Sequence, residues 1–399
     1  MIKMTSKRLK DKKVPNLRFP EFEGEWETKK LREFGEINPK YKKFPSLFVY
    51  IDLESVSNGR LLKEEFINEK EAPSRAQRIL EKGDILFQMV RPYQKNNLFF
   101  NKEGRYVAST GYAQIRTKQN PQFVFQYLHN QKFVDKVIER CTGTSYPAIN
   151  SSDLGNIHIH YPHLNEQSKI ASFLSLVDER IQTQNKIIEY QETLMLGVLT
   201  KIFTQKLKSN SIRTKEFPLW TYKKGGDIFY NCSNKKHNSD LPILAITQEY
   251  GAVPRDLIDH NITVTEKSID SYKVVDKGDF IISLRSFQGG IEYSNYHGIC
   301  SPAYIILKNS IDIVPEFYKH YLKSAAYIKL LNKKLEGIRD GKMISYNYFS
   351  EINLPYPCLE EQKYIADILT TIDNKIKIEK QMLNSLSKQR DYLLQQMFI

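Results

Sequence analysis

Apolar residues recur at alternating spacings of four and three along two long stretches of this 399-residue chain. A repeat of about 3.5 residues that continues for about five heptads predicts a long helix whose apolar seam pairs with another helix in a coiled coil. The seam of the first stretch is Ile170, Leu174, Val177, Ile181, Ile188, Met195, Val198 and Ile202. The seam of the second stretch is Ile365, Leu369, Ile372, Ile376, Leu383, Leu386, Leu393 and Met397. Polar residues interrupt both seams, as is common where a coiled coil has a fixed register: Gln184, Gln191, Glu379 and Arg390.

The two stretches begin with the same phrase. HLNEQSKIASFLSLVDERI starts at His163, and CLEEQKYIADILTTIDNKI starts at Cys358, 195 residues later. The identical pairs are Leu164/Leu359, Glu166/Glu361, Gln167/Gln362, Ile170/Ile365, Ala171/Ala366, Leu174/Leu369, Asp178/Asp373 and Ile181/Ile376. The alternative is two unrelated surface helices, each packed on its own domain. The helices match each other better than the rest of the two halves do, which favours a duplicated helix.

A similar offset relates features outside the helices. A Lys-Gly-Asp triplet precedes an apolar run at 82–84 and again at 277–279, and Arg-Pro-Tyr-Gln at 91–94 is echoed by Arg-Ser-Phe-Gln at 285–288. Weaker echoes are 109–112 with 301–304, and Trp26 with Trp220. Because internal duplication determines architecture, we expect two copies of one unit, each a globular domain followed by a long helix.

The globular parts are expected to mix strands and helices. Short apolar runs predict strands at 47–53, 84–90, 156–162, 241–247, 279–284 and 303–308. Helical periodicity predicts a helix at 123–140 and another at the same place in the second copy, 316–336. The predicted class is α+β, with boundaries at 1–16 (basic tail), 17–160 (domain 1), 161–205 (helix 1), 206–355 (domain 2) and 356–399 (helix 2).

The order of the segments predicts the helix directions. Helix 1 ends just before domain 2, and helix 2 begins just after it. Since the two ends of a domain usually lie close together, helix 2 should start beside the end of helix 1 and run back antiparallel to domain 1. This gives a pseudo-twofold arrangement with one domain at each end of a helix pair.

Composition narrows the class of partner. The formal charge is +13, which favours a polyanion such as nucleic acid. No apolar run approaches the roughly 20 residues of a membrane span, and the N-terminus lacks the apolar core of a signal peptide, so a cytoplasmic location is expected. The four cysteines are scattered without a Cys-x-x-Cys pair, which indicates neither a disulfide framework nor a thiolate metal site.

A catalytic site is not predicted. His158 and His160 alternate along a predicted strand without an acidic neighbour, so their spacing does not indicate a metal site. Asn-Pro-Lys-Tyr at 38–41 differs from the Asn-Pro-Pro-Tyr loop of amino-methyltransferases, and 337–342 is too short for a P-loop. We therefore expect a chain that is not an enzyme by itself and binds no metal or cofactor.

Residues suited to contacting DNA are better represented. Arginine and glutamine can make paired hydrogen bonds to base edges, and small polar or basic loop residues suit phosphate contacts. Basic clusters at 6–13 and 205–215 would add attraction that is independent of sequence. The candidate DNA-binding residues are Arg91, Gln94, Lys95, Thr110, Tyr112, Thr142, Thr144, Tyr146, Arg285, Gln288, Arg339 and Lys342.

These residues together resemble a known family, the specificity (S) subunit of type I restriction-modification systems. The resemblance lies in the doubled entry YPHLNEQSKIASFL and YPCLEEQKYIADIL, the doubled Lys-Gly-Asp, and the opening VPNLRFPEFEGEWE, and it covers nearly the whole chain. It implies two target recognition domains, each binding one half of a split DNA sequence, held apart by two long antiparallel helices.

The resemblance also implies partners. The helices would carry two methyltransferase subunits, which methylate adenine at N6 using S-adenosylmethionine, and an ATP-driven, magnesium-dependent restriction subunit would join for cleavage. The residues expected to form the coil and to face these partners are Glu166, Gln167, Ile170, Leu174, Val177, Ile181, Glu361, Gln362, Ile365, Leu369, Ile372 and Ile376. Two alternatives stay open from the residues alone: a scaffold that touches no DNA, and an autonomous DNA methyltransferase.

Overall fold

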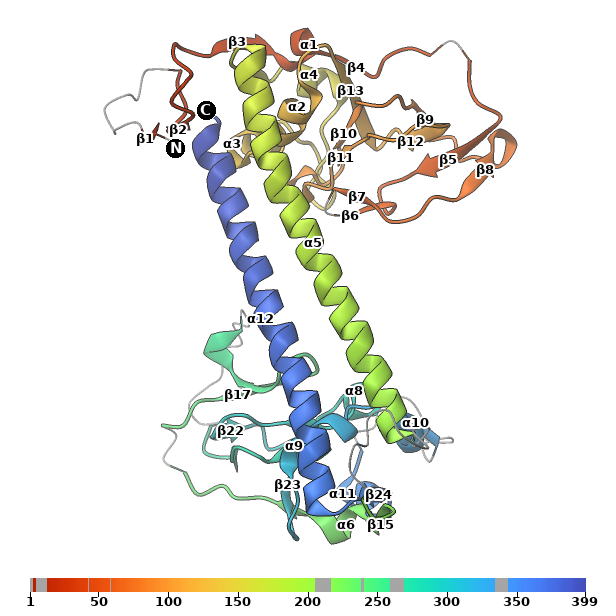
Figure 1. Cartoon of the computed structure of the whole chain (residues 1–399), viewed down its shortest axis with the longest axis vertical. Helices are drawn as coiled ribbons and strands as arrows, with labels where there is room; N and C mark the ends of the chain where they lie inside the picture. Colours follow the sequence, from red (N-terminus) through yellow and green to blue (C-terminus); the bar gives the residue numbers. More distant parts are fainter. Residues whose placement is uncertain are drawn as a thin grey trace. The chain divides into compact units, whose positions relative to one another are not determined.

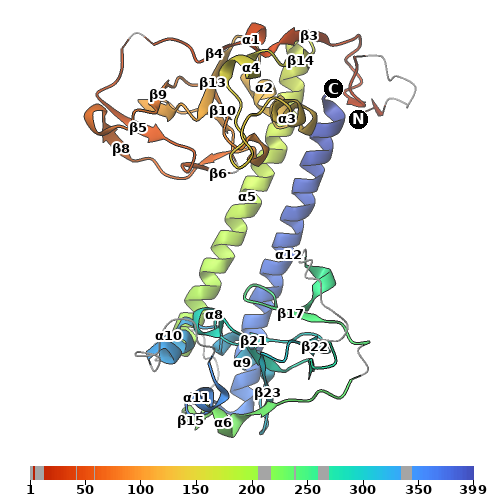
Figure 2. The ribbon, with the colours of Figure 1, turned by 180° about the vertical axis from the view of Figure 1, so that it is seen from behind.

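The computed structural model describes residues 3–4, 13–41, 43–57, 59–204, 217–237, 240–258, 269–333 and 344–399. The chain divides into two compact units (Figures 1 and 2). Unit 1 comprises Met1–Asn185 and Gln381–Ile399, and unit 2 comprises Lys186–Lys380. Each unit therefore combines a mixed α and β domain with one segment of each long helix, α5 (Leu164–Phe203) and α12 (Leu359–Met397).

The strands of unit 1 form two larger sheets and three short pairs among the described residues. One sheet is antiparallel throughout, in the order β11 (Leu98–Phe99), β10 (Ile85–Gln88), β13 (Tyr112–Thr117), β4 (Gly35–Ile37). The other has the order β8 (Phe66–Asn68), β5 (Leu47–Ile51), β12 (Tyr106–Ser109), β9 (Ala76–Ile79), with β5 and β12 parallel. The pairs are β3 (Glu27–Lys30) with β14 (His158–Tyr161), β6 (Val56–Ser57) with β7 (Arg60–Leu61), and β1 (Lys3–Met4) with β2 (Leu17–Arg18).

Unit 2 repeats the first of these sheets. Its order is β21 (Glu292–Tyr293), β20 (Phe280–Ile282), β23 (Ile305–Asn309), β16 (Phe229–Cys232), again antiparallel. The pair β15 (Thr221–Lys224) and β24 (Asn353–Tyr356) corresponds to β3 and β14. The remaining pairs are β17 (Leu244–Thr247) with β18 (Gly251–Pro254) and β19 (Lys273–Val275) with β22 (Gly298–Cys300). Strand order thus confirms the internal repeat that the sequence predicts.

The short helices also correspond. In unit 1 they are α1 (Leu31–Phe34), α2 (Pro121–Tyr127), α3 (Gln131–Ile138) and α4 (Ser151–Gly155), with 3-10 turns η1 (Glu69–Glu71) and η2 (Pro92–Gln94). In unit 2 they are α6 (Gly225–Ile228), α8 (Ser286–Gly289), α9 (Pro315–Tyr321), α10 (Ala325–Lys333) and α11 (Tyr346–Ser350), with η3 (Arg255–Leu257).

Each strand predicted from the apolar runs is present, but the two helices predicted inside the domains are wrong in extent. The stretch 123–140 forms α2 and α3, and 316–336 forms α9 and α10. The break in unit 1 has a local cause, because the side chain of Asn130 accepts a hydrogen bond from Lys132 N at 2.8 Å and so starts a new helix. In unit 2 Ser324 Oγ accepts from Tyr327 N at 3.2 Å.

The Lys-Gly-Asp triplet builds the turn before the central strand of each sheet. Gly83 and Gly278 have φ of 95° and 99°, a conformation that favours glycine. Asp84 is buried, accepts from Glu81 N at 2.7 Å, and pairs with Arg116 on β13 at 2.8 Å. Asp279 accepts from Asp276 N at 2.7 Å and, like Asp84, pairs with a basic residue on the neighbouring strand, Lys308 on β23, at 3.0 Å.

The Gln of the repeated Glu-Gln phrase joins each long helix to its own domain. Gln167 donates from Nε2 to Pro162 O at 2.8 Å and accepts at Oε1 from Asn120 N, the residue before α2, at 3.3 Å. Gln362 donates to Pro357 O at 2.9 Å and accepts from Val314 N, the residue before α9, at 2.9 Å. Both amides are almost fully buried, so they serve the junction between strand, domain helix and long helix.

Glu166 forms a buried ion pair with the N-terminal segment of unit 1. Arg18 donates from Nε and Nη2 to the two Glu166 oxygens at 2.7 Å each, and Trp26 Nε1 lies 3.4 Å from Oε1. The two charged side chains are only 8% and 3% exposed. The remaining arginine protons reach Gly24 O and Glu23 O at 2.6 and 3.0 Å, so the guanidinium is well satisfied.

Both long helices contribute to the core of each unit. In unit 1 Ile170 and Leu174 of α5 share one apolar cluster with Leu394 and Met397 of α12. Phe398 completes this cluster, with its ring 5.4 Å from the rings of both Phe123 and Tyr127. The far end of helix 2 therefore belongs with domain 1, as the order of segments predicts.

In unit 2 the two long helices likewise share one apolar cluster. Met195 and Ile202 of α5 lie in the same apolar cluster as Ile365 and Leu369 of α12. Coiled-coil pairing along the full seam stays a prediction.

Replacing Glu166 with Gln should destabilise unit 1 by about 3–5 kcal/mol, because it leaves the buried Arg18 without a counter-charge. The measurement is the urea unfolding transition of the full chain. The control is Glu21→Gln, which removes the partner of Lys169 in a half-exposed pair at 3.5 Å and should cost less than about 1 kcal/mol. Equal effects of the two variants would contradict a structural role for the Arg18–Glu166 pair.

Candidate nucleic-acid interface

Two candidate loops of unit 1 lie together. Arg91 N, at the start of η2, donates to Pro147 O at 2.7 Å, and Val90 and Thr142 both form bridges to Ala148. The turn places Arg91 and Lys95 at φ of 53° and 54°. A left-handed conformation of a residue other than glycine costs on the order of 1 kcal/mol, and such residues concentrate at functional sites. The loops 91–95 and 142–148 thus form one surface feature, which we term the reading loops.

The reading loops present aromatic and amide groups to solvent. The Arg91 guanidinium lies over the Tyr146 ring at 4.2 Å, while the ring is still 65% exposed. Tyr93 is 49% exposed, and the exposed Gln94 accepts from Gln88 Nε2 at 2.9 Å. The buried Arg91 Nε has no hydrogen-bond partner within the described part of the chain. An arginine placed over an exposed tyrosine ring keeps donors of its guanidinium for other contacts, and a guanidinium can pair with a guanine edge.

The other candidates of the first copy differ in accessibility. Thr142 and Thr144 are exposed on the reading loops, and Thr110 is half-buried, with its backbone N bonded to Arg75 O. Tyr112 is fully buried: its hydroxyl donates to Asp52 O at 3.4 Å, and burial raises its pKa well above the usual range. Burial lowers the pKa of Lys95. Tyr112 therefore supports the domain, whereas Thr142 and Thr144 can reach a ligand.

In the second copy Gln288 lies on α8, and Arg285 is the residue just before this helix. Arg285 and Gln288 are exposed, and Arg285 O accepts from Gln248 Nε2 at 3.4 Å. Gln248 belongs to a loop whose Tyr250 ring is 55% exposed. Lys323 supports this loop, since it donates to Gln248 O at 3.0 Å and pairs with the buried Glu292 at 2.8 Å.

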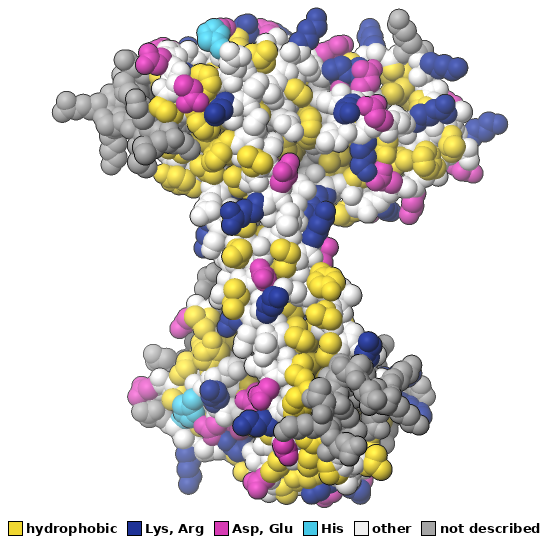
Figure 3. Space-filling view, in the orientation of Figure 1, with side chains coloured by type: hydrophobic (Ala, Val, Ile, Leu, Met, Phe, Trp, Pro, Cys, Tyr) yellow, Lys and Arg dark blue, Asp and Glu magenta, His cyan; other side chains and the backbone are white. Residues whose placement is uncertain are grey.

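Some predicted residues lie outside the described part of the chain. These are Arg339, Lys342, the cluster 205–215, and the cluster 6–13 apart from Lys13. Figure 3 shows Lys and Arg side chains, interleaved with carboxylates, over the part of unit 1 that carries β5, β8 and β9.

Sequence reasoning missed the exposed rings of Tyr93 and Tyr250. Tyr93 lies inside the repeated Arg-x-aromatic-Gln phrase, so that phrase was an available signal. Tyr250 has no such signal, because its neighbourhood has no clear counterpart in the first copy.

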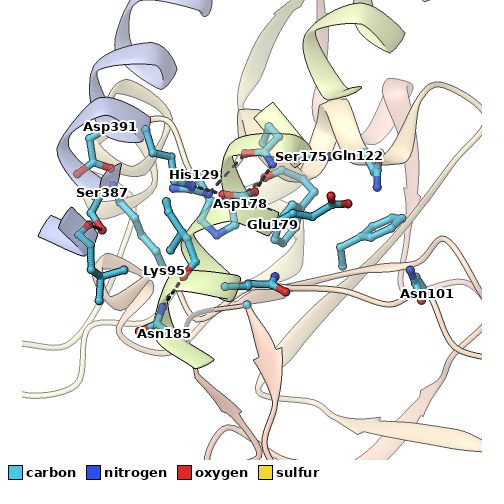
Figure 4. Close-up of a pocket in the computed structure, with 18 of the residues that line it drawn as sticks. Lys95, Asn101, Gln122, His129, Ser175, Asp178, Glu179, Asn185, Ser387 and Asp391 are labelled. Atoms are coloured by element: carbon cyan, nitrogen blue, oxygen red, sulfur yellow. Dashed lines mark hydrogen bonds and ion pairs between the residues drawn. The ribbon is translucent and has the colours of Figure 1, made fainter. Parts of the chain in front are cut away.

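A cavity of about 610 Å³ lies beside the reading loops, within unit 1 (Figure 4). Figure 4 shows His129 beside Asp178, with Ser387 and Asp391 contributed by α12. Among its lining residues, the carboxylates Asp178, Glu179 and Asp391 face the cations Lys95 and Arg390. Burial lowers the pKa of His129 to about 4, so this side chain is neutral at pH 7. The balance of charge among these lining residues does not favour a phosphate in the cavity.

The predicted coil and partner residues are mostly enclosed. Glu166, Gln167, Glu361 and Gln362 are buried, and the bonds of Glu166, Gln167 and Gln362 given above go to their own domains. Ile170 and Leu174 lie in the core of unit 1, and Ile365 and Leu369 in that of unit 2. The half-buried members are Val177, Ile181, Ile372 and Ile376.

The remaining features concern metal binding, membrane spans and thiols. Among those described, no three His, Cys, Asp or Glu side chains are grouped to hold a metal ion. No described helix is long and apolar enough to cross a membrane. The four cysteines are free thiols.

Comparison with known proteins identifies relatives over nearly the whole chain. The family model for the type I restriction modification DNA specificity domain matches residues 23–190 and 218–388. Each match spans one domain and most of the long helix that follows it, which agrees with the repeat read from the sequence.

Individual relatives agree with the family model. The putative type I restriction enzyme MjaX specificity subunit of Methanocaldococcus jannaschii is 24% identical over 403 residues, covering 93% of this chain and 92% of that one. The type I restriction enzyme MjaVIII specificity subunit of the same organism is 25% identical over 411 residues, covering 96% and 93%. A crystal structure of the type I restriction-modification system S subunit from M. genitalium has a TM-score of 0.62 at 19% identity, covering 97% and 99% of the chains, and so shares the fold.

Removing the Tyr146 ring should weaken binding of double-stranded DNA, because the ring is exposed and also holds Arg91 in place. For Tyr146→Ala we expect a loss of about 1–3 kcal/mol, measured by fluorescence anisotropy at fixed salt. The control is Tyr190→Ala, which removes a ring that is 71% exposed on α5. If both variants bind like the unchanged protein, the reading loops do not contact DNA.

Proposed function

The chain belongs to the type I restriction-modification DNA specificity family, and on that basis we propose that its two recognition domains each read one half of a bipartite DNA target. The observation that carries the proposal is that the two units share their scaffold but differ in their exposed loops. Strand order, the Lys-Gly-Asp turn and the Gln junction recur in both units. The loops that present Arg91 and Arg285 differ, one as a 3-10 turn and the other as the short helix α8. A common scaffold with different exposed loops suits two readers of different short sequences.

The long helices would set the gap between the half-sites. Rigid separation of two reading modules determines the spacing of the half-sites they bind. In this proposal α5 and α12 pair as an antiparallel coiled coil. Two seam residues support it: Ile188 and Leu386 are only 7% and 8% exposed, although neither belongs to a domain core cluster.

The chemistry would reside on partner subunits. We propose that the helices carry two methyltransferase subunits, which bind S-adenosylmethionine and methylate adenine at N6. Restriction subunits that use ATP and magnesium would join for cleavage. The supporting feature is that the two units present similar helix segments, so the same partner could bind twice. In this scheme the chain supplies recognition and position and takes no part in bond making or breaking.

Exchange of domain 1 tests the assignment of half-sites. Replacing residues 17–155 with the corresponding domain of another family member should change one half of the methylated sequence and leave the other half and the gap unchanged. The measurement is a genome-wide map of N6-methyladenine in cells that carry the complete system with each version of the chain. A reciprocal exchange of 218–352 is the matched control and should alter only the other half.

Two outcomes would contradict the proposal. A change in both halves from a single exchange would exclude independent readers. Binding of the full chain to DNA that does not fall as salt rises would favour a scaffold without a phosphate footprint, because each neutralised phosphate adds to the salt dependence of the affinity.

Placing a charged residue in the apolar seam tests whether α5 and α12 pair. Ile188→Asp and Leu386→Asp should each cost more than about 2 kcal/mol, since a carboxylate would be buried without a partner. We expect faster amide exchange along α5 and α12 with unchanged exchange in the domain sheets. Leu196→Asp, at a position 65% exposed on α5, is the control. Unchanged exchange along the helices in the Ile188 and Leu386 variants would rule out the seam.

A further inference from the structure

One pair of identities in the repeated phrase belongs neither to the apolar seam nor to the Glu-Gln junction: Asp178 and Asp373. Each carboxylate instead contacts the domain helix of its own unit. In unit 1 Gln126 of α2 donates from Nε2 to Asp178 Oδ2 at 2.6 Å. In unit 2 Lys319 of α9 pairs with Asp373 Oδ2 at 2.8 Å, and the neighbouring His320 Nε2 lies 4.0 Å away.

The aspartate and the junction glutamine hold the same short helix at its two ends. Gln167 bonds to the backbone before α2, and Asp178 bonds near the end of α2, at Gln126. Eleven residues separate Gln167 from Asp178, which is close to three helical turns, so both side chains lie on one face of α5. Gln362 and Asp373 have the same separation and hold the start and end of α9.

The two copies of this attachment differ in their third member. Arg390 of α12 donates to Asp178 Oδ1, and its Nη2 lies 3.5 Å from Gln126 Oε1, so the contact in unit 1 joins α2, α5 and α12. Arg390 and Asp178 are 18% and 21% exposed. The repeat places Met195 where Arg390 stands, and Met195 lies in the apolar core of unit 2. Asp373 is more exposed, at 36%, and pairs with residues of α9 alone among the described contacts.

We propose that Asp178 and Asp373 are positioning residues that fix the angle of each recognition domain on its long helix, and that the clamp of unit 1 is the stronger because Arg390 ties it to α12. This inference rests on the proposed function for its consequence in DNA recognition. A domain held at both ends of one helix cannot tilt, so its half-site is accepted only at one distance from the other. Loosening the clamp should relax the accepted gap while leaving the bases read within each half-site unchanged.

The first experiment needs no DNA. Amide exchange of α2 in the full chain is compared among Asp178→Asn, Arg390→Gln and the double variant. Each single variant should lower the protection of α2 by about tenfold, and the double variant should lower it little further, because both changes break the same contact. Glu179→Gln, an exposed neighbour on the same helix, is the matched control and should leave the protection unchanged. Additive losses, or a loss in the control, would overturn the clamp.

The second experiment measures how strictly the protein selects the length of the gap between its two half-sites. Once the methylated target is mapped, full-length variants are titrated with duplexes that keep both half-sites but lengthen or shorten the gap by one base pair. The unchanged protein should prefer its own gap, and Asp178→Asn should reduce that preference about three- to tenfold, with a smaller reduction for Asp373→Asn. Discrimination against a base change inside either half-site should stay as in the unchanged protein.

The outcomes separate the two proposals. A variant that loses DNA affinity equally at every gap has only lost folded protein, and that result would overturn the positioning role. If the unchanged protein shows no preference for any DNA sequence, the proposed function fails. The amide-exchange measurement on α2 still decides whether the clamp exists.

Discussion

Each half of the chain depends on a buried glutamine amide at the point where a strand becomes a long helix. Gln167 and Gln362 bond to the carbonyl of the preceding proline and to the backbone N–H before the domain helix. Loss of such a bond in the interior leaves polar groups unsatisfied at a cost of about 1–3 kcal/mol. These partners are backbone groups, so the residues that carry them can change, although Gln167 Nε2 also donates to Gln119 Oε1 at 3.1 Å. Asn120 in one copy and Val314 in the other occupy the same position without altering the junction.

At the central sheet, too, the residues that hold the fold together are different from those that the surface loops present. The buried Asp84 and Asp279 each close a turn through a backbone N–H and pair with a basic residue on the neighbouring strand. The basic residue is Arg116 in one copy and Lys308 in the other, since the buried carboxylate requires a positive charge but not one particular side chain. Loops that follow this sheet bear none of these constraints. They can therefore change the residues they present without destabilising the fold.

The architecture was predictable because its signals are periodic. Seam spacing predicts α5 and α12 to within a few residues. The repeated offset indicates the duplication without any assignment of local elements. The helix breaks at Asn130 and Ser324 were not predictable from periodicity, because a single capping side chain interrupts an apolar pattern that continues through it. Tyr112 belongs to a repeated phrase, and repetition marks scaffold residues as well as surface residues; its ring is fully buried. One sequence cannot distinguish these two reasons for repetition.

The repeat also explains why the two halves are similar but not interchangeable. A carboxylate on each long helix meets a domain helix in both units, yet the third partner is Arg390 in one and the apolar Met195 in the other. An arginine pair that is four-fifths buried costs desolvation, which good hydrogen-bond geometry must offset. Gln126 supplies part of that geometry in unit 1, because it bonds to Asp178 and lies within reach of Arg390. In unit 2 the domain helix itself supplies the cation through Lys319, so α5 needs no charge there and packs through apolar residues such as Met195. The duplicated aspartate has therefore kept its role while its surroundings adapted to the helix that each unit places beside it.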